Sequence, residues 1–357
     1  MSIDSGTIDQ QKLEHFLGRF AADSAAAAHS ATVLLGHRLG LFRALAEAGP
    51  QRADELAART GCHPRLITEW LHAQVASQYC AYDPHSRTYW LTPEQTACLA
   101  DESSPHFVAG NALAVNVVHR DEPQVEQAFT GDGRIGWHEH HPDLFTAAER
   151  ACRGLYETSL LDKWVPALDG VHERLRAGGR IADVGCGFGT STILLARSYP
   201  DATVCGFDYH EPSIAAARKA AAAAGVSDRV TFEVAGGDAF GGRDYDLVCM
   251  FNAFHEMGDP TGVARHVRSV LTVDGSFMVS EPFASDRVED NRTPIGRNFY
   301  SMSTMVCVPN ALSQNATRAL GAQAGAAALQ EVLVEAGFGR VRPVVAAPPA
   351  LVVEAKP

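Results

Sequence analysis

The spacing of hydrophobic residues predicts helices at the start of the chain. Residues 8–48 are rich in alanine and leucine, and larger apolar side chains recur at helical spacing, as at Phe16 and Phe20. The pattern stops at Gly49-Pro50, a pair that is typical of a helix end. We therefore expect two helices in this segment.

The next segment predicts a winged helix. It contains a short helix over residues 53–60, a turn at 61–64 and a helix over 65–77. A polar–apolar alternation over 79–91 follows, and a turn at 83–86 interrupts it. Helix, turn, helix and hairpin in this order are typical of a winged-helix domain.

The charge of this segment argues against DNA binding. A helix that reads a groove carries several Arg or Lys side chains, whereas the helix over 65–77 sets one arginine against Glu69. The basic and acidic residues between positions 51 and 92 balance: Arg52, Arg59, Arg65 and Arg87 against Asp54, Glu55, Glu69 and Asp83. We expect this domain to make a dimer contact or to cover a substrate site.

Residues 101–165 predict an interrupted helical connector. An apolar stretch over 106–118 and a helix over 142–164 lie on either side of a glycine-rich break at 131–133. Before the second helix comes the sequence Trp137-His-Glu-His-His141.

The three histidines of this sequence could supply metal ligands, but no second cluster at ligand spacing would complete a site. We therefore predict no metal. The remaining interpretations are a polar loop at a domain junction and a contact of His138 with a substrate.

From residue 178 onward, strands alternate with helices. Each strand candidate is nearly all apolar, as strands buried on both faces are, so we predict a parallel sheet with helices on both sides. Helices over 213–224 and 261–271 begin after prolines, which suit a first helical turn. The strand candidates are residues 180–184, 202–207, 230–234, 246–251 and 276–280.

The turn after the first of these strands is rich in glycine. It reads Asp183-Val-Gly-Cys-Gly-Phe-Gly-Thr190, and Gly185 and Gly187 allow a ligand to approach the backbone. The helix that begins near Thr190 directs its free N–H groups at the same place. A dinucleotide-binding fingerprint has its third glycine at the position of Thr190, so this spacing departs from it.

Three further polar motifs follow the next three strands in order. Asp208 ends the second strand, Gly-Gly-Asp238-Ala-Phe240 follows the third, and Asn252 opens Asn-Ala-Phe-His255-Glu after the fourth. The four motifs together resemble class I S-adenosylmethionine-dependent methyltransferases, over residues 166–357. With the winged helix in front, the chain is similar to small-molecule O-methyltransferases.

This resemblance implies a Rossmann-like seven-stranded α/β sheet, S-adenosylmethionine as the cofactor and a small-molecule methyl acceptor. Asp208 would accept hydrogen bonds from the ribose hydroxyls, since the next helix starts too late to need it as a cap. Asp238 would read the adenine amino group, and the ring of Phe240 would lie against adenine. The implied cofactor-binding residues are Asp183, Gly185, Gly187, Gly189, Asp208, Tyr209, Asp238, Ala239, Phe240 and Asn252.

The pair His255-Glu256 matches the position of the general base in these O-methyltransferases. Imidazole can take the proton of a phenol as the methyl group arrives, because a phenol with a pKa near 10 is mostly protonated at neutral pH. The family pattern has Asp in place of Glu256 and a Trp that this chain lacks. A nitrogen or carbon nucleophile and a histidine that merely packs are the alternatives, while Asp259 is explained as a helix cap before Pro260.

Residues from about 282 to 320 interrupt the sheet, as a substrate lid would. Helix 325–337 and strands at 341–345 and 351–354 then resemble the end of the methyltransferase fold. The lid side chains expected to bind the acceptor are Arg297, Phe299, Tyr300 and Met302.

Composition sets outer limits. Of the 357 residues, 46% are hydrophobic, and the net charge of −12 disfavours a nucleic-acid backbone as the main partner. The eight cysteines are scattered, so neither disulfides nor a structural zinc is expected. No run reaches the length of a membrane span and no signal-peptide profile is present, so we expect a cytoplasmic protein.

We predict a homodimer with N-terminal helices and winged helix over 1–100, a helical connector and cap over 101–165, and a methyltransferase domain over 166–357. A winged-helix transcription factor that senses S-adenosylmethionine is the alternative from another class of protein.

Overall fold

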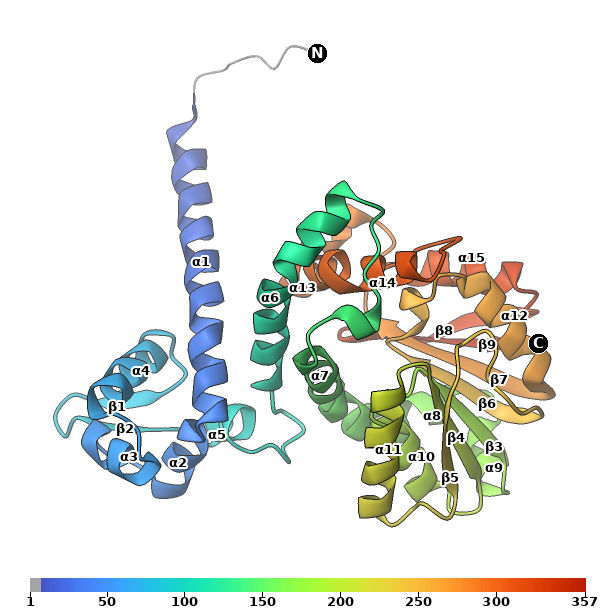
Figure 1. Cartoon of the computed structure of the whole chain (residues 1–357), viewed down its shortest axis with the longest axis horizontal. Helices are drawn as coiled ribbons and strands as arrows, with labels where there is room; N and C mark the ends of the chain where they lie inside the picture. Colours follow the sequence, from blue (N-terminus) through green and yellow to red (C-terminus); the bar gives the residue numbers. More distant parts are fainter. Residues whose placement is uncertain (1–7) are drawn as a thin grey trace. The chain divides into compact units, whose positions relative to one another are not determined.

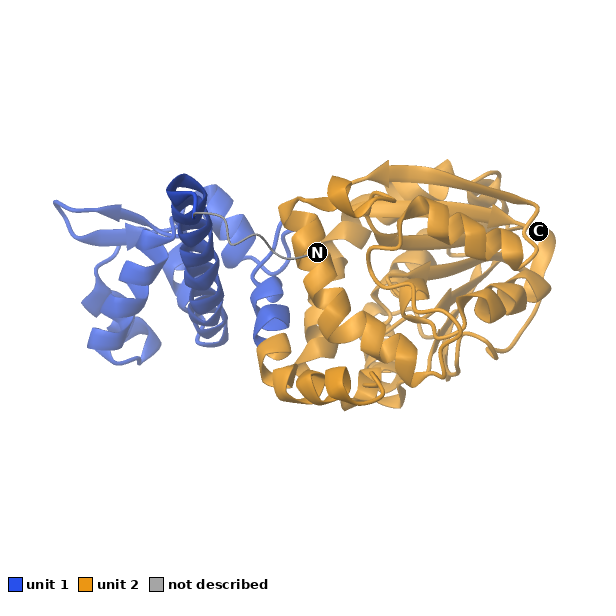
Figure 2. Cartoon of the chain, turned by 90° about the horizontal axis from the view of Figure 1, so that it is seen from above, with its two compact units in different colours: residues 1–116 blue, residues 117–357 orange. Residues whose placement is uncertain are grey.

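The computed structural model describes residues 8–357 and divides the chain into two compact units, residues 1–116 and 117–357 (Figure 2). The boundary between the units falls within the segment 101–165, which the sequence predicts as a helical connector and cap.

The first unit contains the predicted helices and hairpin. Trp70 fixes the long first helix to the domain, because its indole N–H donates to the carbonyl of Thr32 at 2.9 Å and its ring packs against Phe42. The elements are α1 (Gln10–Arg38), α2 (Leu41–Ala48), α3 (Ala53–Thr60), α4 (Pro64–Ala76), β1 (Ala81–Asp83), β2 (Thr88–Trp90) and α5 (Pro93–Leu99).

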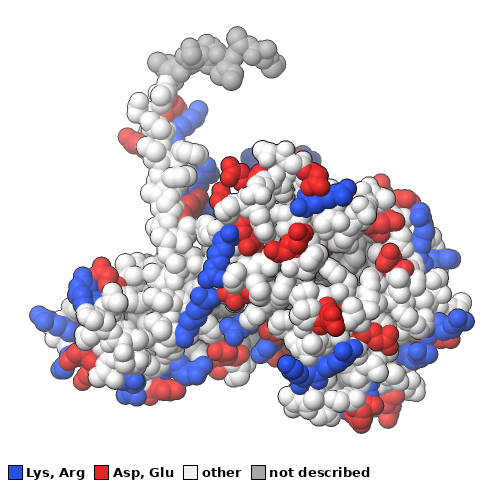
Figure 3. Space-filling view, in the orientation of Figure 1, with Lys and Arg blue, Asp and Glu red and all other residues white. Residues whose placement is uncertain are grey.

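The winged helix presents paired charges. Arg52 lies 2.8 Å from Asp54, and Arg65 of α4 lies 2.5 Å from Glu69. Both arginines are therefore opposed by a neighbouring acid. Figure 3 shows blue and red side chains intermixed on this face of the domain.

A helical layer precedes the sheet. Its elements are α6 (Gly110–Thr130), the single turn η1 (Trp137–Glu139), α7 (Asp143–Ser159), the wide turn η2 (Leu160–Trp164), α8 (Val165–Ala167) and α9 (Val171–Arg176). Helix α7 starts one residue after the predicted start, but it ends at Ser159, and the rest of the predicted helix is the wide turn η2.

The second unit is built on a seven-stranded sheet in the order β5-β4-β3-β6-β7-β9-β8 (Figure 1). The first five strands in this order are parallel, and β9 is antiparallel to both of its neighbours. The predicted Rossmann-like class is confirmed. The strands are β3 (Arg180–Val184), β4 (Thr203–Asp208), β5 (Val230–Val234), β6 (Tyr245–Phe251), β7 (Leu271–Pro282), β8 (Arg340–Ala347) and β9 (Ala350–Lys356).

The remaining helices connect these strands. They are α10 (Thr190–Ser198), α11 (Glu211–Ala224), η3 (Phe254–Glu256), α12 (Pro260–Val270), η4 (Val288–Asn291), α13 (Pro294–Met302), the wide turn η5 (Ser303–Cys307), α14 (Val308–Ser313) and α15 (Gly325–Glu335). The predicted lid thus consists mainly of helices α13 and α14.

Helices cover both faces of the sheet. Successive side chains of a strand point to opposite faces, so one strand contributes to two cores. Ile181 of β3 belongs to a core with Leu195 of α10, whereas Ala182 and Val184 belong to a second core with Val267 of α12. Full burial of one such aliphatic side chain contributes about 1.5–3 kcal/mol. The continuous apolar strands of the sequence follow from this two-sided packing.

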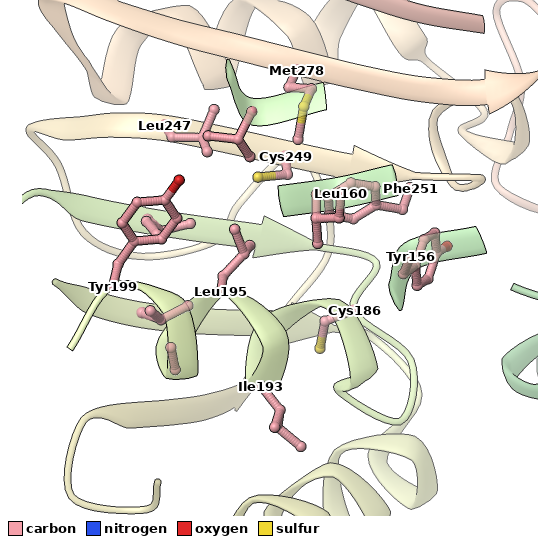
Figure 4. Close-up of a cluster of buried hydrophobic side chains, with 14 of the residues drawn as sticks. Tyr156, Leu160, Cys186, Ile193, Leu195, Tyr199, Leu247, Cys249, Phe251 and Met278 are labelled. Carbon is pink, nitrogen blue, oxygen red and sulfur yellow. The ribbon is translucent and has the colours of Figure 1, made fainter. Parts of the chain in front are cut away.

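Figure 4 shows the first of these cores, in which Leu247 and Cys249 of β6 lie near Leu195. Helices α10 and α11 pack into this core, and α12 and α15 pack into the other. The connections therefore change face between β3 and β6. Ligands of open α/β sheets bind in the crevice that such a change leaves at the carboxyl ends of the strands.

Within residues 8–357, no helix combines the length and apolar character that a membrane crossing requires.

Candidate active site

A cavity of about 510 Å³ lies at the carboxyl ends of the parallel strands, within the size range of small-molecule sites. The loops after β3, β4, β5 and β6 line it, together with η1, α7 and α14. Those loops carry the four motifs. The sequence predicted a cap over 101–165 but named none of the lining residues of α7 or of α14 and its C-cap. These are Phe145, Ala148, Glu149, Cys152, Tyr156, Asn310, Ser313 and Gln314.

The glycine-rich turn forms the floor of this cavity. Gly185 has φ of +74°, and an added Cβ would approach the Cβ of Ala253 to 2.6 Å. Gly187 has φ of +52° and would meet nothing within 4 Å, so it leaves open space for a ligand beside the backbone. Gly189 does not line the cavity. It starts α10 with φ of +81° and packs close to Phe232.

Asp183 lies behind this floor. Its carboxylate is fully buried, and Oδ2 accepts hydrogen bonds from the hydroxyls of Ser191 and Thr192, each at 2.6 Å. Its Oδ1 is buried without a hydrogen-bond partner among the described residues. Burial raises the pKa of Asp183 to about 6, although the two hydroxyls oppose the shift. Asp183 therefore fixes the start of α10 to β3 and does not reach the cavity.

Asp208 stands at the end of β4 and faces the cavity. Its Oδ2 accepts the N–H of Gly187 at 2.9 Å, and Oδ1 accepts the N–H of His210 at 2.8 Å. Burial raises the pKa of this carboxyl, and these two donors oppose the shift. Tyr209 also lines the cavity, and its hydroxyl donates to Oδ1 of Asn310 at 3.5 Å.

The motif after β5 is divided between the cavity and the core. Asp238 lines the cavity, but Ala239 does not. Phe240 is buried elsewhere, with its ring 5.1 Å from Phe207 and in edge contact with His266. The structure therefore gives no support to the expectation that Phe240 stacks on adenine.

Asn252 occupies a left-handed turn after β6, with φ of +51°. Its Nδ2 donates to Sγ of Cys152 and to the hydroxyl of Tyr156, each at 3.3 Å. Both partners come from α7. Asn252 thus lines the cavity while it fixes this helix to the end of β6.

His255 is buried and does not line the cavity. Its Nδ1 is hydrogen-bonded to Oε2 of Glu281, and Oε1 of Glu281 accepts the backbone N–H of His255 at 3.3 Å. Burial alone would lower the pKa of His255, but the carboxylate of Glu281 outweighs it and raises the pKa well above its ordinary value. The carboxylate of Glu281 therefore favours the charged form of the His255 ring.

Glu256 faces the cavity instead. Its Oε1 lies 3.8 Å from Nε2 of His255, and its Oε2 accepts a hydrogen bond from Nδ2 of Asn310 at 3.0 Å. Burial raises the pKa of Glu256 above its ordinary value, although the charge of His255 opposes the shift. Because its pKa is raised, the carboxylate of Glu256 is a stronger base than that of an ordinary glutamate, and it can accept a proton while its contacts to His255 and Asn310 remain.

His255, Glu256 and Cys307 are the one group in the described part of the chain whose atoms could ligate a metal, all within 4.8 Å of one another. The histidines of the 137–141 loop form no such group among the described residues.

The expected lid residues do not reach the cavity. Arg297 and Tyr300 are exposed, and Phe299 and Met302 pack against a small core that includes Leu144. Among the expected acceptor-binding residues, His138 lines the cavity. The polar wall near Glu256 comes from α14, where the sequence offers polar positions but no recognisable motif.

Comparisons with known proteins agree with this architecture. Residues 175–337 match the model described as a methyltransferase domain, and residues 27–101 match an Rv2258c-like winged HTH domain. The chain therefore carries a methyltransferase domain behind a winged-helix domain, as the sequence predicted, and is an enzyme of that class. No curated protein matches it in sequence.

Solved structures of the same fold cover almost the whole chain. A putative O-methyltransferase from Nostoc punctiforme is 17% identical with a TM-score of 0.71, covering 99% of this chain and 100% of that chain. The mitomycin 7-O-methyltransferase is 17% identical with a TM-score of 0.73, covering 98% and 99%. Human N-acetylserotonin methyltransferase, in complex with S-adenosylmethionine, is 18% identical with a TM-score of 0.72, covering 99% of both chains.

Proposed function

We propose that this methyltransferase domain transfers a methyl group from S-adenosylmethionine to a small-molecule acceptor, most favourably to a hydroxyl oxygen. The single observation that carries the proposal is the cavity at the carboxyl ends of the strands, which joins the glycine floor, Asp208 and Glu256 in one space. The O-methyltransferase names of the similar structures support an oxygen acceptor.

The residues present fit this cofactor. Gly187 leaves space beside the backbone, and Asp208 offers carboxylate lone pairs at the strand end, where ribose hydroxyls can donate to them. Asp238 lines the same space at the end of β5 and can accept from an amino group. When bound, S-adenosylmethionine supplies an electrophilic methyl group on a sulfonium.

Glu256 is the group that we assign to accept the proton of the acceptor hydroxyl. It is the titratable side chain of the pair that faces the cavity, while His255 lies behind it as a cation held by Glu281. As the hydroxyl oxygen attacks the methyl group, its proton passes to the carboxylate of Glu256. The positive charge of His255 then remains paired with Glu281, so the pair needs no rearrangement.

A nitrogen acceptor is the second candidate for the same cavity, because an amine bearing a proton could also use Glu256. For the alternative of a regulator that only senses the cofactor, the winged helix offers little support, because Arg65 of its second helix is paired with Glu69. Methyl transfer to an acceptor indicates an enzyme, whereas binding of duplex DNA without methyl transfer indicates a regulator.

The decisive experiment incubates the full chain with S-adenosylmethionine and a panel of small phenols, alcohols and amines, and follows each acceptor by mass. We expect at least one hydroxyl acceptor to gain a single methyl group, with S-adenosylhomocysteine formed in equal amount. Cofactor binding without any turnover, together with retention of duplex DNA at physiological salt, would support the regulator instead.

We also propose that the chain forms a homodimer through α1. Leu13, Phe16, Leu17 and Phe20 share one face of this helix, and Phe16 and Phe20 are 54% and 63% exposed in the single chain. Figure 3 shows red and blue side chains on the half of α1 nearer the N-terminus, with white surface between them. A monomer rarely leaves such a stripe in water, whereas a second copy can cover it.

A further inference from the structure

The side chain of Asn310 connects three walls of the cavity. It is buried on α14, and its Oδ1 accepts the backbone N–H of Trp137 at 3.0 Å and lies 3.5 Å from the hydroxyl of Tyr209. Its Nδ2 donates to Oε2 of Glu256 at 3.0 Å. The amide of Gln314, one turn further on, points at the same Oδ1 from 3.4 Å.

These partners fix which way the amide points. The backbone N–H of Trp137 can only donate, so the atom that faces it must be the carbonyl oxygen of Asn310. The other end must then be the NH₂ group, and it faces the carboxylate of Glu256. A flipped amide would set donor against donor on one side and acceptor against acceptor on the other.

The fixed amide has a consequence for Glu256. An NH₂ group can donate to a carboxylate, so this contact favours the ionised form, which is the form that can accept a proton. It also occupies one lone pair of Oε2 only, since each carboxylate oxygen has two. A lone pair therefore remains available for the proton of an acceptor.

We propose that Asn310 is a positioning residue for methyl transfer, which aims Glu256 at the acceptor and keeps it ionised. The proposal rests on the assignment of Glu256 as the proton acceptor. Because the same amide also contacts Trp137 and Tyr209, it ties that orientation to the η1 turn and to the end of β4, two walls that line the cavity.

The test replaces the donor without changing the shape of the side chain. Asn310→Asp keeps an oxygen for Trp137 and Tyr209, but it loses the NH₂ group and sets a second carboxylate beside Glu256. Two carboxylates at this separation share a proton, so the apparent pKa of the pair rises. We expect the acidic limb of kcat/KM to move upward by about one pH unit or more, so that kcat/KM measured on that limb falls by roughly tenfold or more.

Two matched variants complete the design. Asn298→Asp introduces the same charge on the exposed face of α13 and should leave the profile of the parent unchanged. In a Glu256→Gln background, Asn310→Asp should have almost no further effect on kcat, because the group that it acts upon is gone. Thermal unfolding of each variant establishes that the folded fraction is comparable, and Asn310→Ala replaces Asn310→Asp if the latter does not fold.

A purely structural role predicts a different result. Asn310→Asp would then lower kcat by the same factor in both backgrounds and leave the pH profile in place, and that outcome would overturn the proposal. If the parent protein shows no methyl transfer, or if Glu256→Gln alone has no effect, the fault lies in the proposed function. If the parent and Glu256→Gln behave as proposed but Asn310→Asp retains the parental profile, the role of Asn310 is refuted.

Discussion

Replacing Glu256 with glutamine isolates the proton acceptor. Glutamine has the same shape, and its carbonyl oxygen can still accept the hydrogen bond of Asn310, so the fold should survive. It cannot accept a proton from an acceptor hydroxyl. General base catalysis contributes about 10²- to 10⁴-fold, so kcat should fall by that factor, equivalent to about 2.7–5.4 kcal/mol of transition-state stabilisation.

The pH dependence supplies an independent readout. The active form of Glu256 is the carboxylate, and burial raises its pKa. The kcat/KM of the parent should therefore fall as the pH drops through that raised pKa, because the carboxylate becomes protonated. Glu256→Gln should lack this inflection, since glutamine does not titrate.

The assay measures initial rates for one confirmed acceptor across pH 5–9 and the affinity for S-adenosylmethionine by calorimetry. Glu157→Gln, an exposed position on α7, is the matched control and should behave as the parent. Cofactor affinity should stay within about threefold in both variants, because the proton acceptor acts on the other substrate. A Glu256→Gln enzyme with kcat within about threefold of the parent, or with the parental inflection, would refute the assignment.

Three further predictions concern the supporting structure. His255→Ala leaves the buried Glu281 without its cationic partner and should cost about 3–5 kcal/mol of unfolding free energy, measured by urea denaturation; a loss below about 1 kcal/mol would contradict the ion pair. Asp183 binds its proton more tightly in the folded state, with a pKa of about 6, than when unfolded, so its stabilising contribution is present at low pH and is lost as the pH rises from about 4 to 6. In that window the stability of Asp183→Asn relative to the parent should rise by about 3 kcal/mol, and a constant difference would disprove the shift. Phe16→Glu should convert the dimer to monomer in light scattering at micromolar concentration, and a parent that is already monomeric would exclude the α1 interface.

The sheet was predictable because its signal is local. The central strands β3 and β6 are buried on both faces and therefore read as continuous apolar runs, whereas the edge strand β5 alternates buried and exposed residues. The helices between the strands start at prolines such as Pro212 and Pro260. The glycine turn and Asp208 follow directly from those strands. Their arrangement at one edge is a property of parallel topology, so the sequence order alone indicated a common site.

The acceptor side was not predictable in this way. The pKa of His255 depends on Glu281, which is distant in sequence. Glu281 contacts His255 only because β7 packs beside β6. The aromatic side chains of α13 looked suited to a pocket, but Phe299 instead fills a small core. Asn310 belongs to no motif, and its importance appears only when α14 lies against η3.

Equilibrium binding of S-adenosylmethionine tests the central claim most directly. Asp208→Ala removes the carboxylate that would accept the ribose hydroxyls and should weaken binding by about 2–3 kcal/mol, or roughly 30- to 150-fold, in titration calorimetry. Asp274→Ala, at an exposed position of β7, should bind as the parent does. Equal affinity of the Asp208→Ala and parent proteins for S-adenosylmethionine, or tighter binding of NAD by the parent, would contradict the assignment of this cavity to a methyl donor.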